Sequence, residues 1–224
     1  MLSNPHAGKL ITFEGIDGSG KSEQFRRAIT VIGAYHPEIK FFETKEPTKE
    51  ASGVKIYDIL FGRHPIFKLE EMHPFDMQEL YFEDRIVHYK NIVIPKLMDG
   101  THIISDRGVA SKVYGVNHPS DFVTLSRLEE DMFKQADVPY LWPDAILIYD
   151  VPVSVAMERL KAKKIELDKF EQEQNLVRVK QNYIDFANQF PNCHIIDGNA
   201  DPTTVFVETR RILGKIFGVS EWSK

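Results

Sequence analysis

The chain has 224 residues, and a hydrophobic content of 42% with 27% charged residues is ordinary for a soluble globular protein. The formal net charge of −5 argues against a groove for nucleic acid, and no apolar run approaches the roughly 18 residues that a membrane helix needs. The N-terminus lacks the pattern of a signal peptide, and the single cysteine, Cys193, cannot form an intrachain disulfide. We therefore expect a cytoplasmic protein that folds as a single domain over residues 1–224.

The first predicted strand leads directly into a glycine-rich loop. Residues 9–13 are short, apolar and β-prone, and residues 22–32 place apolar side chains at helical spacing. The loop between them reads Gly-x-x-x-x-Gly-Lys-Ser, the P-loop pattern, in which backbone N–H groups at a helix N-terminus bind phosphate. Lys21 is expected to reach the outer phosphates of ATP, and the Ser22 hydroxyl to hold Mg²⁺. The residues expected to bind the nucleotide are Gly15, Ile16, Asp17, Gly18, Ser19, Gly20, Lys21 and Ser22.

Strands and helices alternate along the rest of the chain. Apolar runs predict further strands at 39–44, 101–107, 144–150 and 194–197. Helical periodicity predicts helices at 50–62, 76–98 (with Pro95 as a kink or late break), 109–116, 120–138 and 153–164, then one ending near 190 and one at 203–217. This order predicts a three-layer α/β fold of the P-loop NTPase type, with a parallel five-stranded sheet, helices on both faces and a lid.

Charged residues follow several of the predicted strands. Lys45, Asp106, Arg107 and Asp150 stand at or just after strand ends, on the same edge of the sheet as the P-loop. Ligands bind at the carboxyl ends of the strands in sheets of this kind. The sequence therefore predicts an active-site cleft along this edge.

Other sequence features distinguish among the classes of P-loop protein. A switch GTPase would have an Asn-Lys-x-Asp motif after a strand, which this sequence lacks, and motor or transporter ATPases are usually longer. A small kinase needs an acceptor pocket and a basic lid. The polar stretch at about 161–175 is a candidate lid, because five basic groups between Arg159 and Phe170 outnumber Glu166 and Asp168 and give a local charge of +3. A solvated, charged helix end is the alternative for this stretch.

Five ordered stretches carry a resemblance to a known family. Residues 13–22 are close to the P-loop of the thymidylate kinases, and residues 45–48 stand where that family has Arg-Glu-Pro-Gly-Gly-Thr. Residues 84–85 resemble its Asp-Arg or Ala-Arg motif, and residues 143–152 resemble its Pro-Asp-Leu-x-x-x-Leu-Asp-Val. Asp106-Arg107 followed by Ser111 and Tyr114 resembles its Asp-Arg-Tyr-x-x-Ser-x-x-Ala-Tyr-Gln. The chain thus resembles a thymidylate kinase of the nucleoside-monophosphate kinase family over nearly its whole length.

The resemblance implies an activity and assigns residues to it. The implied reaction is ATP-dependent phosphorylation of dTMP to dTDP with Mg²⁺, in a homodimer formed through the helix at 76–98. Tyr81 would stack on the thymine ring, Arg85 would bind its edge, and Arg107 would bind the acceptor phosphate with its guanidinium fork. The expected catalytic residues are Lys21, Asp17 and Arg107, and the expected metal-site residues are Ser22 and Asp17. The expected substrate-binding residues are Lys45, Tyr81, Arg85, Asp106, Arg107, Ser111 and Tyr114.

The sequence departs from the family pattern near the acceptor site, and alternatives follow. Lys45 replaces an arginine, Gly108 follows Arg107 in place of an aromatic residue, and Gly115 takes the place of a tyrosine. Asp17 could contact Mg²⁺ or an arginine, and Glu14 could be catalytic or only a charge at a strand end. The alternative functions are another nucleoside-monophosphate or deoxynucleoside kinase on this scaffold, or a nucleotide-binding module without catalysis.

Overall fold

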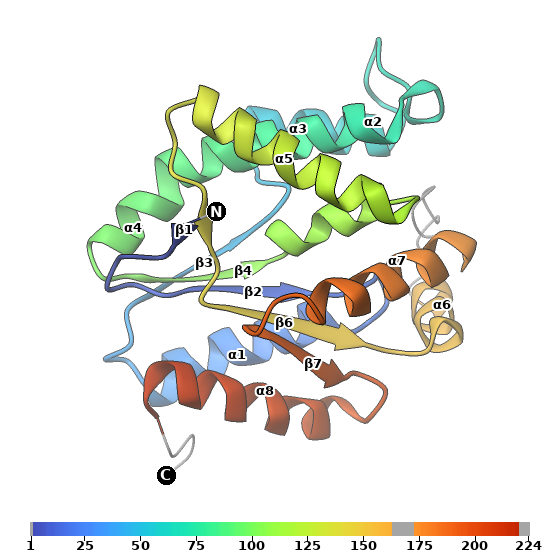
Figure 1. The fold of residues 1–224 in the computed structure, drawn as a ribbon. Helices are drawn as coiled ribbons and strands as arrows, with labels where there is room; N and C mark the ends of the chain where they lie inside the picture. The colour runs from blue at the N-terminus through green and yellow to red at the C-terminus, as the bar shows by residue number, and fades with distance from the viewer. Residues whose placement is uncertain (1, 163–172, 220–224) are drawn as a thin grey trace.

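A five-stranded parallel sheet forms the centre of the computed structural model, which describes residues 2–162 and 173–219 (Figure 1). The strand order is β3-β4-β2-β6-β7, so β2 lies at the centre, β3 forms one edge with β4 between it and β2, and β6 and β7 extend the sheet on the other side. The predicted α/β architecture is confirmed. The strands of the sheet are β2 (Leu10–Glu14), β3 (Phe41–Lys45), β4 (His102–Asp106), β6 (Ala145–Asp150) and β7 (Cys193–Asp197).

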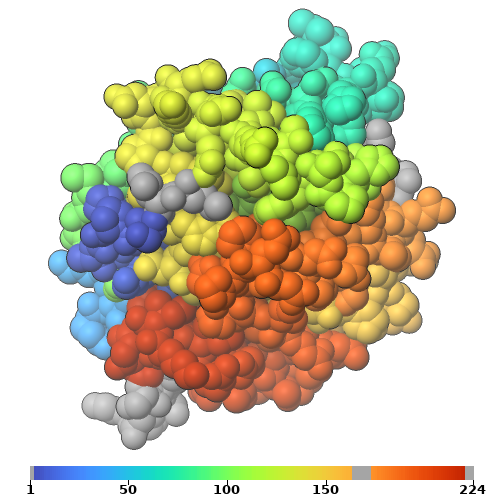
Figure 2. Space-filling model, in the orientation of Figure 1, coloured from blue at the N-terminus to red at the C-terminus, as the bar shows by residue number. Residues whose placement is uncertain are grey.

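Helices cover both faces of this sheet. Helices α1 and α8 pack together on one face, and α3, α4, α5 and α7 cover the other (Figure 1). On the side seen in Figure 2, α7 fills the surface between α5 and α8. The α-helices are α1 (Lys21–Tyr35), α2 (Ala51–Leu60), α3 (Pro74–His88), α4 (Ile94–Met98), α5 (Pro119–Gln135), α6 (Val153–Ala162), α7 (Glu173–Ala187) and α8 (Pro202–Phe217).

Alternation along β2 explains why the sheet has two cores. Ile11 and Phe13 belong to the core shared with α1 and α8, whereas Leu10 belongs to the larger core on the opposite face. Thr12 and Glu14 lie on the same side of β2 as Leu10 and are also buried, so this side of the strand is buried without being wholly apolar. The two cores hold the strand ends that carry the charged residues.

The helix predicted at 76–98 is divided by an irregular turn. Helix α3 ends at His88, a π-helical turn occupies Tyr89–Val93, and α4 continues from Ile94. Pro95 does not stop the helix, although its ring carries no N–H for the backbone hydrogen bond that a regular α-helix would form at this position. The widened turn before it relieves the clash that a proline ring makes with the carbonyl four residues earlier.

Other differences from the predicted elements are local. Residues 109–116 form a 3-10 helix (η3, Val109–Gly115) rather than an α-helix, and the predicted loop at 63–74 contains a 3-10 turn (η1, Leu69–Glu71). That segment, between α2 and α3, projects from the body of the molecule (Figures 1 and 2). A two-residue parallel pair of β1 (Leu2–Ser3) and β5 (Leu141–Trp142) was not predicted, because two residues carry no periodicity.

The candidate lid is described only at its ends. Residues 161–162 close α6 and residues 173–175 open α7. The central residues of the lid, among them Lys163, Lys164, Glu166, Asp168, Lys169 and Phe170, lie outside the described residues. Within 2–162 and 173–219, no helix is long and apolar enough to cross a bilayer.

Candidate active site

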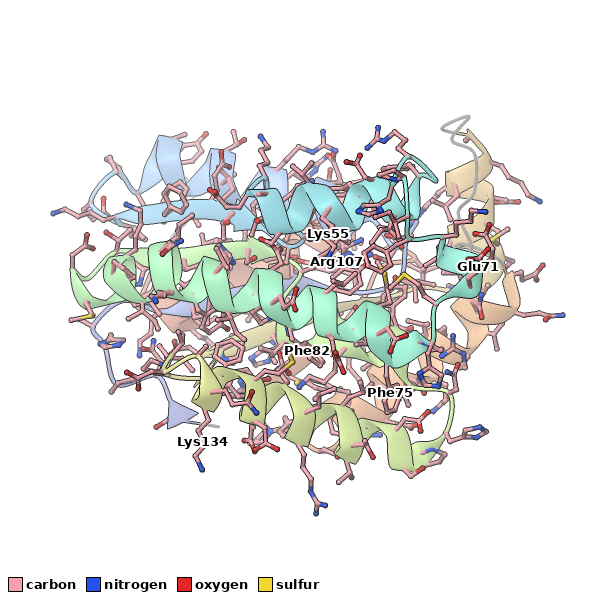
Figure 3. All side chains as sticks on the ribbon, turned by 90° about the horizontal axis from the view of Figure 1, so that it is seen from above. Lys55, Glu71, Phe75, Phe82, Arg107 and Lys134 are labelled. Atoms are coloured by element: carbon pink, nitrogen blue, oxygen red, sulfur yellow. The ribbon has the colours of Figure 1, made fainter. Side chains whose placement is uncertain are left out.

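Parallel register brings the charged strand ends together over a cavity. Asp106 lies level with Phe13 on one side and with Lys45 on the other. The cavity beside these ends has a volume of about 280 Å³, and Arg107 is seen between α2 and α3 when the molecule is viewed from above (Figure 3). It is lined by all the predicted catalytic and substrate-binding residues, namely Asp17, Lys21, Lys45, Tyr81, Arg85, Asp106, Arg107, Ser111 and Tyr114, together with Ser22, Glu46, Pro47, Tyr57, Leu60, Phe61, Gln78 and Lys112.

The P-loop is shaped by backbone conformations that a side chain would disturb. Gly15 has a φ of +138°, and a Cβ added to Gly18 would lie 2.4 Å from the carbonyl oxygen of Ala156. Arg159, which was noted near the lid, instead donates to the carbonyl oxygens of Ser19 (3.3 Å) and Gly198 (3.2 Å). Arg159 therefore ties the P-loop to the turn after β7.

Asp17 lies between two cations. Its Oδ1 is 3.2 Å from Lys21 Nζ and 2.5 Å from Nη2 of Arg107, and Tyr114 donates to its Oδ2 at 3.1 Å. Burial by itself would raise the pKa of Asp17, but Arg107 and then Lys21 outweigh it and hold the pKa below its usual value. Asp17 is thus a stable anion that links the P-loop lysine to the arginine after β4.

A hydroxyl and a carboxylate adjoin each other at the start of α1. The Ser22 hydroxyl donates to Oδ2 of Asp106 at 2.8 Å, while the buried Oδ1 of Asp106 has no hydrogen-bond partner in the described chain. Two such oxygens suit Mg²⁺, which binds through one or two protein oxygens plus substrate phosphates and water. No group of three or more His, Cys, Asp or Glu side chains is placed to hold a metal within the described ranges. Since Asp17 contacts two cations, Ser22 and Asp106 are the better fit for the ion.

Arg107 is held in an unusual backbone conformation. Its φ of +76° is rare for a residue with a Cβ, and such strain tends to occur at functional sites. Its N–H donates to the carbonyl of Phe13 at 2.9 Å, and the Ser105 hydroxyl donates to its carbonyl oxygen at 2.7 Å. Besides Asp17, its guanidinium reaches Ser111 Oγ at 3.4 Å and the Tyr183 hydroxyl at 3.5 Å. The backbone thus aims a fixed guanidinium into the cavity.

Behind Arg107 lies a fully buried carboxyl group. Oε2 of Glu14 accepts hydrogen bonds from Ser111 at 2.7 Å and Tyr183 at 3.0 Å, whereas its Oε1 has no partner among the described residues. Burial raises the pKa of Glu14 to about 7, although the Arg107 charge and these two hydroxyls act in the opposite direction. Tyr183, on α7, was not anticipated from the sequence.

This raised pKa predicts a pH-dependent stability difference for Glu14→Gln. Between the unfolded pKa of 4.5 and the folded pKa of about 7, the folded state holds a proton that the unfolded chain has lost. The wild-type free energy of unfolding therefore falls as pH rises through this window, by about 3 kcal/mol. Glutamine does not titrate. In urea denaturation, the free energy of unfolding of Glu14→Gln relative to that of wild type should therefore rise by about 2–3 kcal/mol between pH 5 and pH 8. The variant Glu70→Gln, at an exposed position outside α3, should show no such gain, and an equal difference at both pH values for Glu14→Gln would contradict the assignment.

The α3 wall of the cavity carries Tyr81 and Arg85. The Arg85 guanidinium is buried and donates to Glu46 (2.8 Å), to the carbonyl of Gly108 (2.8 Å) and to Glu129. Arg85 therefore lines the cavity as an anchored group rather than a free one.

The other members of the predicted motifs stabilise the loop after β3. Asp84 accepts from the Thr48 N–H at 2.8 Å, from its hydroxyl at 2.6 Å and from Ser52 at 2.6 Å. Lys45 lies over the Tyr57 ring, with Nζ 4.9 Å from its centroid. Asp150, expected at the same sheet edge, pairs with Lys180 of α7 and does not line the cavity.

A buried ionic group under the cavity was missed from the sequence. Glu129 of α5 is completely buried and contacts Arg85 and Lys112, and the Tyr140 hydroxyl donates to it at 2.5 Å. One signal could have found it, because Glu129 lies between Leu125 and Phe133 at i, i+4, i+8 spacing on the buried side of α5.

Comparison with known proteins gives a consistent result. The family model described as "Thymidylate kinase" matches residues 13–208. A thymidylate kinase of Nitrosomonas europaea is 33% identical over 196 residues, covering 86% of each chain. One from Janthinobacterium sp. is 32% identical over 93% of this chain and 98% of its own length, and one from Carboxydothermus hydrogenoformans is 31% identical over 94% and 99%.

Proposed function

The chain belongs to the thymidylate kinase family, and from that premise we propose how its cavity phosphorylates dTMP to dTDP at the expense of ATP. The observation that carries the proposal is the continuity of the cavity, which runs from Lys21 and Ser22 of the P-loop to Tyr81 and Arg85 of α3. In the reaction, the bond from the γ-phosphorus to the β,γ-bridging oxygen of ATP breaks, and a bond to an oxygen of the acceptor phosphate forms. The transfer depends mainly on positioning and on neutralising charge.

The donor end of the cavity is the P-loop. Its backbone N–H groups at the start of α1 would hold the phosphates of ATP, and Lys21 would neutralise the phosphoryl group during transfer. Ser22 and Asp106 would hold Mg²⁺, which supplies positive charge to the phosphate oxygens when bound. Asp17 would keep Lys21 and Arg107 at a fixed separation, so that donor and acceptor sites are positioned relative to each other.

The acceptor end begins at Arg107 and extends along α3. Arg107 would bind the acceptor phosphate, Lys45 would add a second positive charge, and Tyr81 would stack on the base. Ser111 and Tyr114, which contact Arg107 at 3.4 and 3.3 Å, would keep its guanidinium in place. Five of the predicted substrate-binding residues thus have a role at the acceptor end, while Asp106 is assigned to the metal and Arg85 is anchored in the cavity wall.

An Arg107→Lys variant tests the acceptor-phosphate role. An ammonium group cannot reproduce a two-pronged guanidinium contact, and the loss of one charge-assisted hydrogen bond is expected to cost about 1.5–3 kcal/mol. The kcat/KM for dTMP should therefore fall about ten- to a hundredfold, while the KM for ATP stays unchanged. The exposed Arg127→Lys is the matched control in steady-state assays, and an unchanged kcat/KM for Arg107→Lys would remove the assigned role.

The function as a whole is tested by measuring ADP release from the wild-type protein. Turnover is expected with ATP, Mg²⁺ and dTMP. A panel of dTMP, dUMP, UMP, dCMP, dGMP and thymidine then ranks the acceptors, and dTMP should give the highest kcat/KM. No turnover with dTMP, with ATP binding retained in calorimetry, would instead indicate a nucleotide-binding module.

We also propose that the protein is a cytoplasmic homodimer with α3 at its interface, as the resemblance to the family implies. The outer side of α3 presents Glu79 and Glu83 beside the half-buried Leu80 and Val87. This mixture of charged and apolar side chains suits contact with a second copy of the chain. Sedimentation velocity should give about twice the chain mass of 25.8 kDa. A monomer at micromolar concentration would refute the dimer.

A further inference from the structure

We propose that Gln78, to which neither the predicted motifs nor the cavity mechanism assigns a role, binds the edge of the acceptor base. The inference rests on the proposed function, since it requires a pyrimidine nucleotide at the α3 end of the cavity. It adds a residue that sets affinity for the base.

The position of Gln78 on α3 places it with the other base-site residues. Gln78, Tyr81 and Arg85 stand at i, i+3 and i+7, so they share one face of the helix, and all three line the cavity. Gln78 is only 2% exposed, and no hydrogen bond joins its side-chain amide to another residue in 2–162 or 173–219. Its amide atoms are not among the fully buried polar atoms that lack a partner, so they open onto the cavity, where a ligand can form hydrogen bonds with them.

Gly115 makes the space that Gln78 occupies. A Cβ added to Gly115 would lie 2.5 Å from Cγ and 2.9 Å from Cδ of Gln78, both too close for a real contact. The family pattern has a tyrosine at this point of the sequence, and that side chain could not coexist with Gln78 in its present position. The glycine and the glutamine therefore form a matched pair at the cavity wall.

The chemistry of the wall explains what an amide adds. The neighbouring Arg85 and Lys112 can only donate hydrogen bonds, so they suit the carbonyl oxygens of a base but not its N–H. The imide edge of thymine or uracil presents an N–H beside a carbonyl. Gln78 is the single amide among the described lining residues, and it offers an acceptor beside a donor. Its carbonyl would accept the N3–H, and its NH₂ would donate to the adjacent oxygen.

The first test replaces Gln78 with leucine, which has a similar size but no polar group. Loss of the base contact should raise the KM for dTMP about tenfold with kcat and the KM for ATP nearly unchanged, because the contact is made equally in ground state and transition state. Gln135→Leu, at the exposed end of α5, is the matched control and should behave as wild type. A KM for dTMP within twofold of wild type in Gln78→Leu would overturn the proposal.

A second test changes the ligand and also the residue that makes room for Gln78, so that the result does not depend on one variant. Thymidine monophosphate methylated at N3 lacks the N–H, and its loss of affinity relative to dTMP should be about tenfold greater in wild type than in Gln78→Leu. In the wild-type background, Gly115→Ala should displace Gln78 and raise the KM for dTMP. In the Gln78→Leu background, adding Gly115→Ala should change the KM for dTMP much less. Equal methylation penalties in both proteins would overturn the assignment. Failure of wild type to use dTMP at all would refute the proposed function instead.

Discussion

Lys21→Ala is expected to lower kcat by about a hundred- to a thousandfold without unfolding the protein. The Lys21 ammonium is buried at the P-loop and lies 3.2 Å from Asp17, where it can follow the charge that develops on the transferred phosphoryl group. Removing a preorganised charge of this kind has an effect of that size on the transition state. Asp17 keeps Arg107 as a partner in the variant, so the carboxylate is not left alone. The measurement is ADP release at saturating dTMP, with thermal unfolding followed in parallel.

The matched control for Lys21→Ala removes a lysine far from the cavity. Lys134 is exposed at the end of α5 (Figure 3), and Lys134→Ala should retain wild-type kcat. ATP binding by calorimetry separates a loss of transfer from a loss of donor binding. A kcat for Lys21→Ala within tenfold of wild type would show that the P-loop lysine does not act on the transferred group.

Glu129→Gln is expected to lower the free energy of unfolding by about 3–5 kcal/mol. Glu129 is the buried carboxylate that faces both Arg85 and Lys112, and burial alone would raise its pKa, but Lys112 and then Arg85 hold that pKa below its usual value. Replacing the Glu129 carboxylate with a neutral amide leaves the buried cations of Arg85 and Lys112 with less negative charge to offset them. Removing one partner of a buried ion pair in this way strongly lowers stability. Urea denaturation with a two-state analysis measures the change.

Two further variants separate the charge effect from packing. Asp131→Asn removes a charge from the exposed side of α5 and should change stability by less than about 0.5 kcal/mol. The double variant Lys112→Met/Glu129→Met should be more stable than Glu129→Met alone, because it removes an unpaired cation together with the carboxylate. If the double variant is the less stable of the two, the charge balance at Glu129 is not what stabilises this site.

The fold could be predicted from the sequence because its strong signals are local. Parallel strands buried on both faces read as apolar runs, and the P-loop follows the first of the sheet strands with its helix immediately after. The order of elements then leaves few topologies, since crossovers are right-handed and neighbouring elements pack together. What failed was the detail of helix geometry: neither the π-helical turn at Tyr89–Val93 nor the 3-10 character of η3 has a periodicity of its own that is long enough to detect.

The residues of the candidate site could be predicted from the sequence where they belong to motifs, but not where their role depends on which side chains pack around them. Lys21, Asp106 and Arg107 stand in recognisable patterns at strand ends, and the cavity lining contains them. Gln78 and Lys112 stand in no pattern, because their importance comes from what lies opposite them in space. For Arg85 the prediction was partial. Its motif indicated a contact with the base, but it did not indicate the three groups of this chain that hold the guanidinium.

The π-helical turn at Tyr89–Val93 has a consequence for how this protein tolerates insertions and deletions. An α-helix advances about 100° per residue, and a π-helical turn accommodates one residue more than an α-turn. Because the turn is wider, α3, which presents Gln78 to the cavity, and α4, whose Leu97 packs in the core, keep nearly the relative orientation of one unbroken α-helix. Losing a single residue from this turn would let it close as an ordinary α-turn, whereas losing a residue from within α3 would rotate the two sides of the deletion by about 100°. The turn at Tyr89–Val93 is therefore a place in the helix where the residue count can change by one while the acceptor wall keeps its orientation.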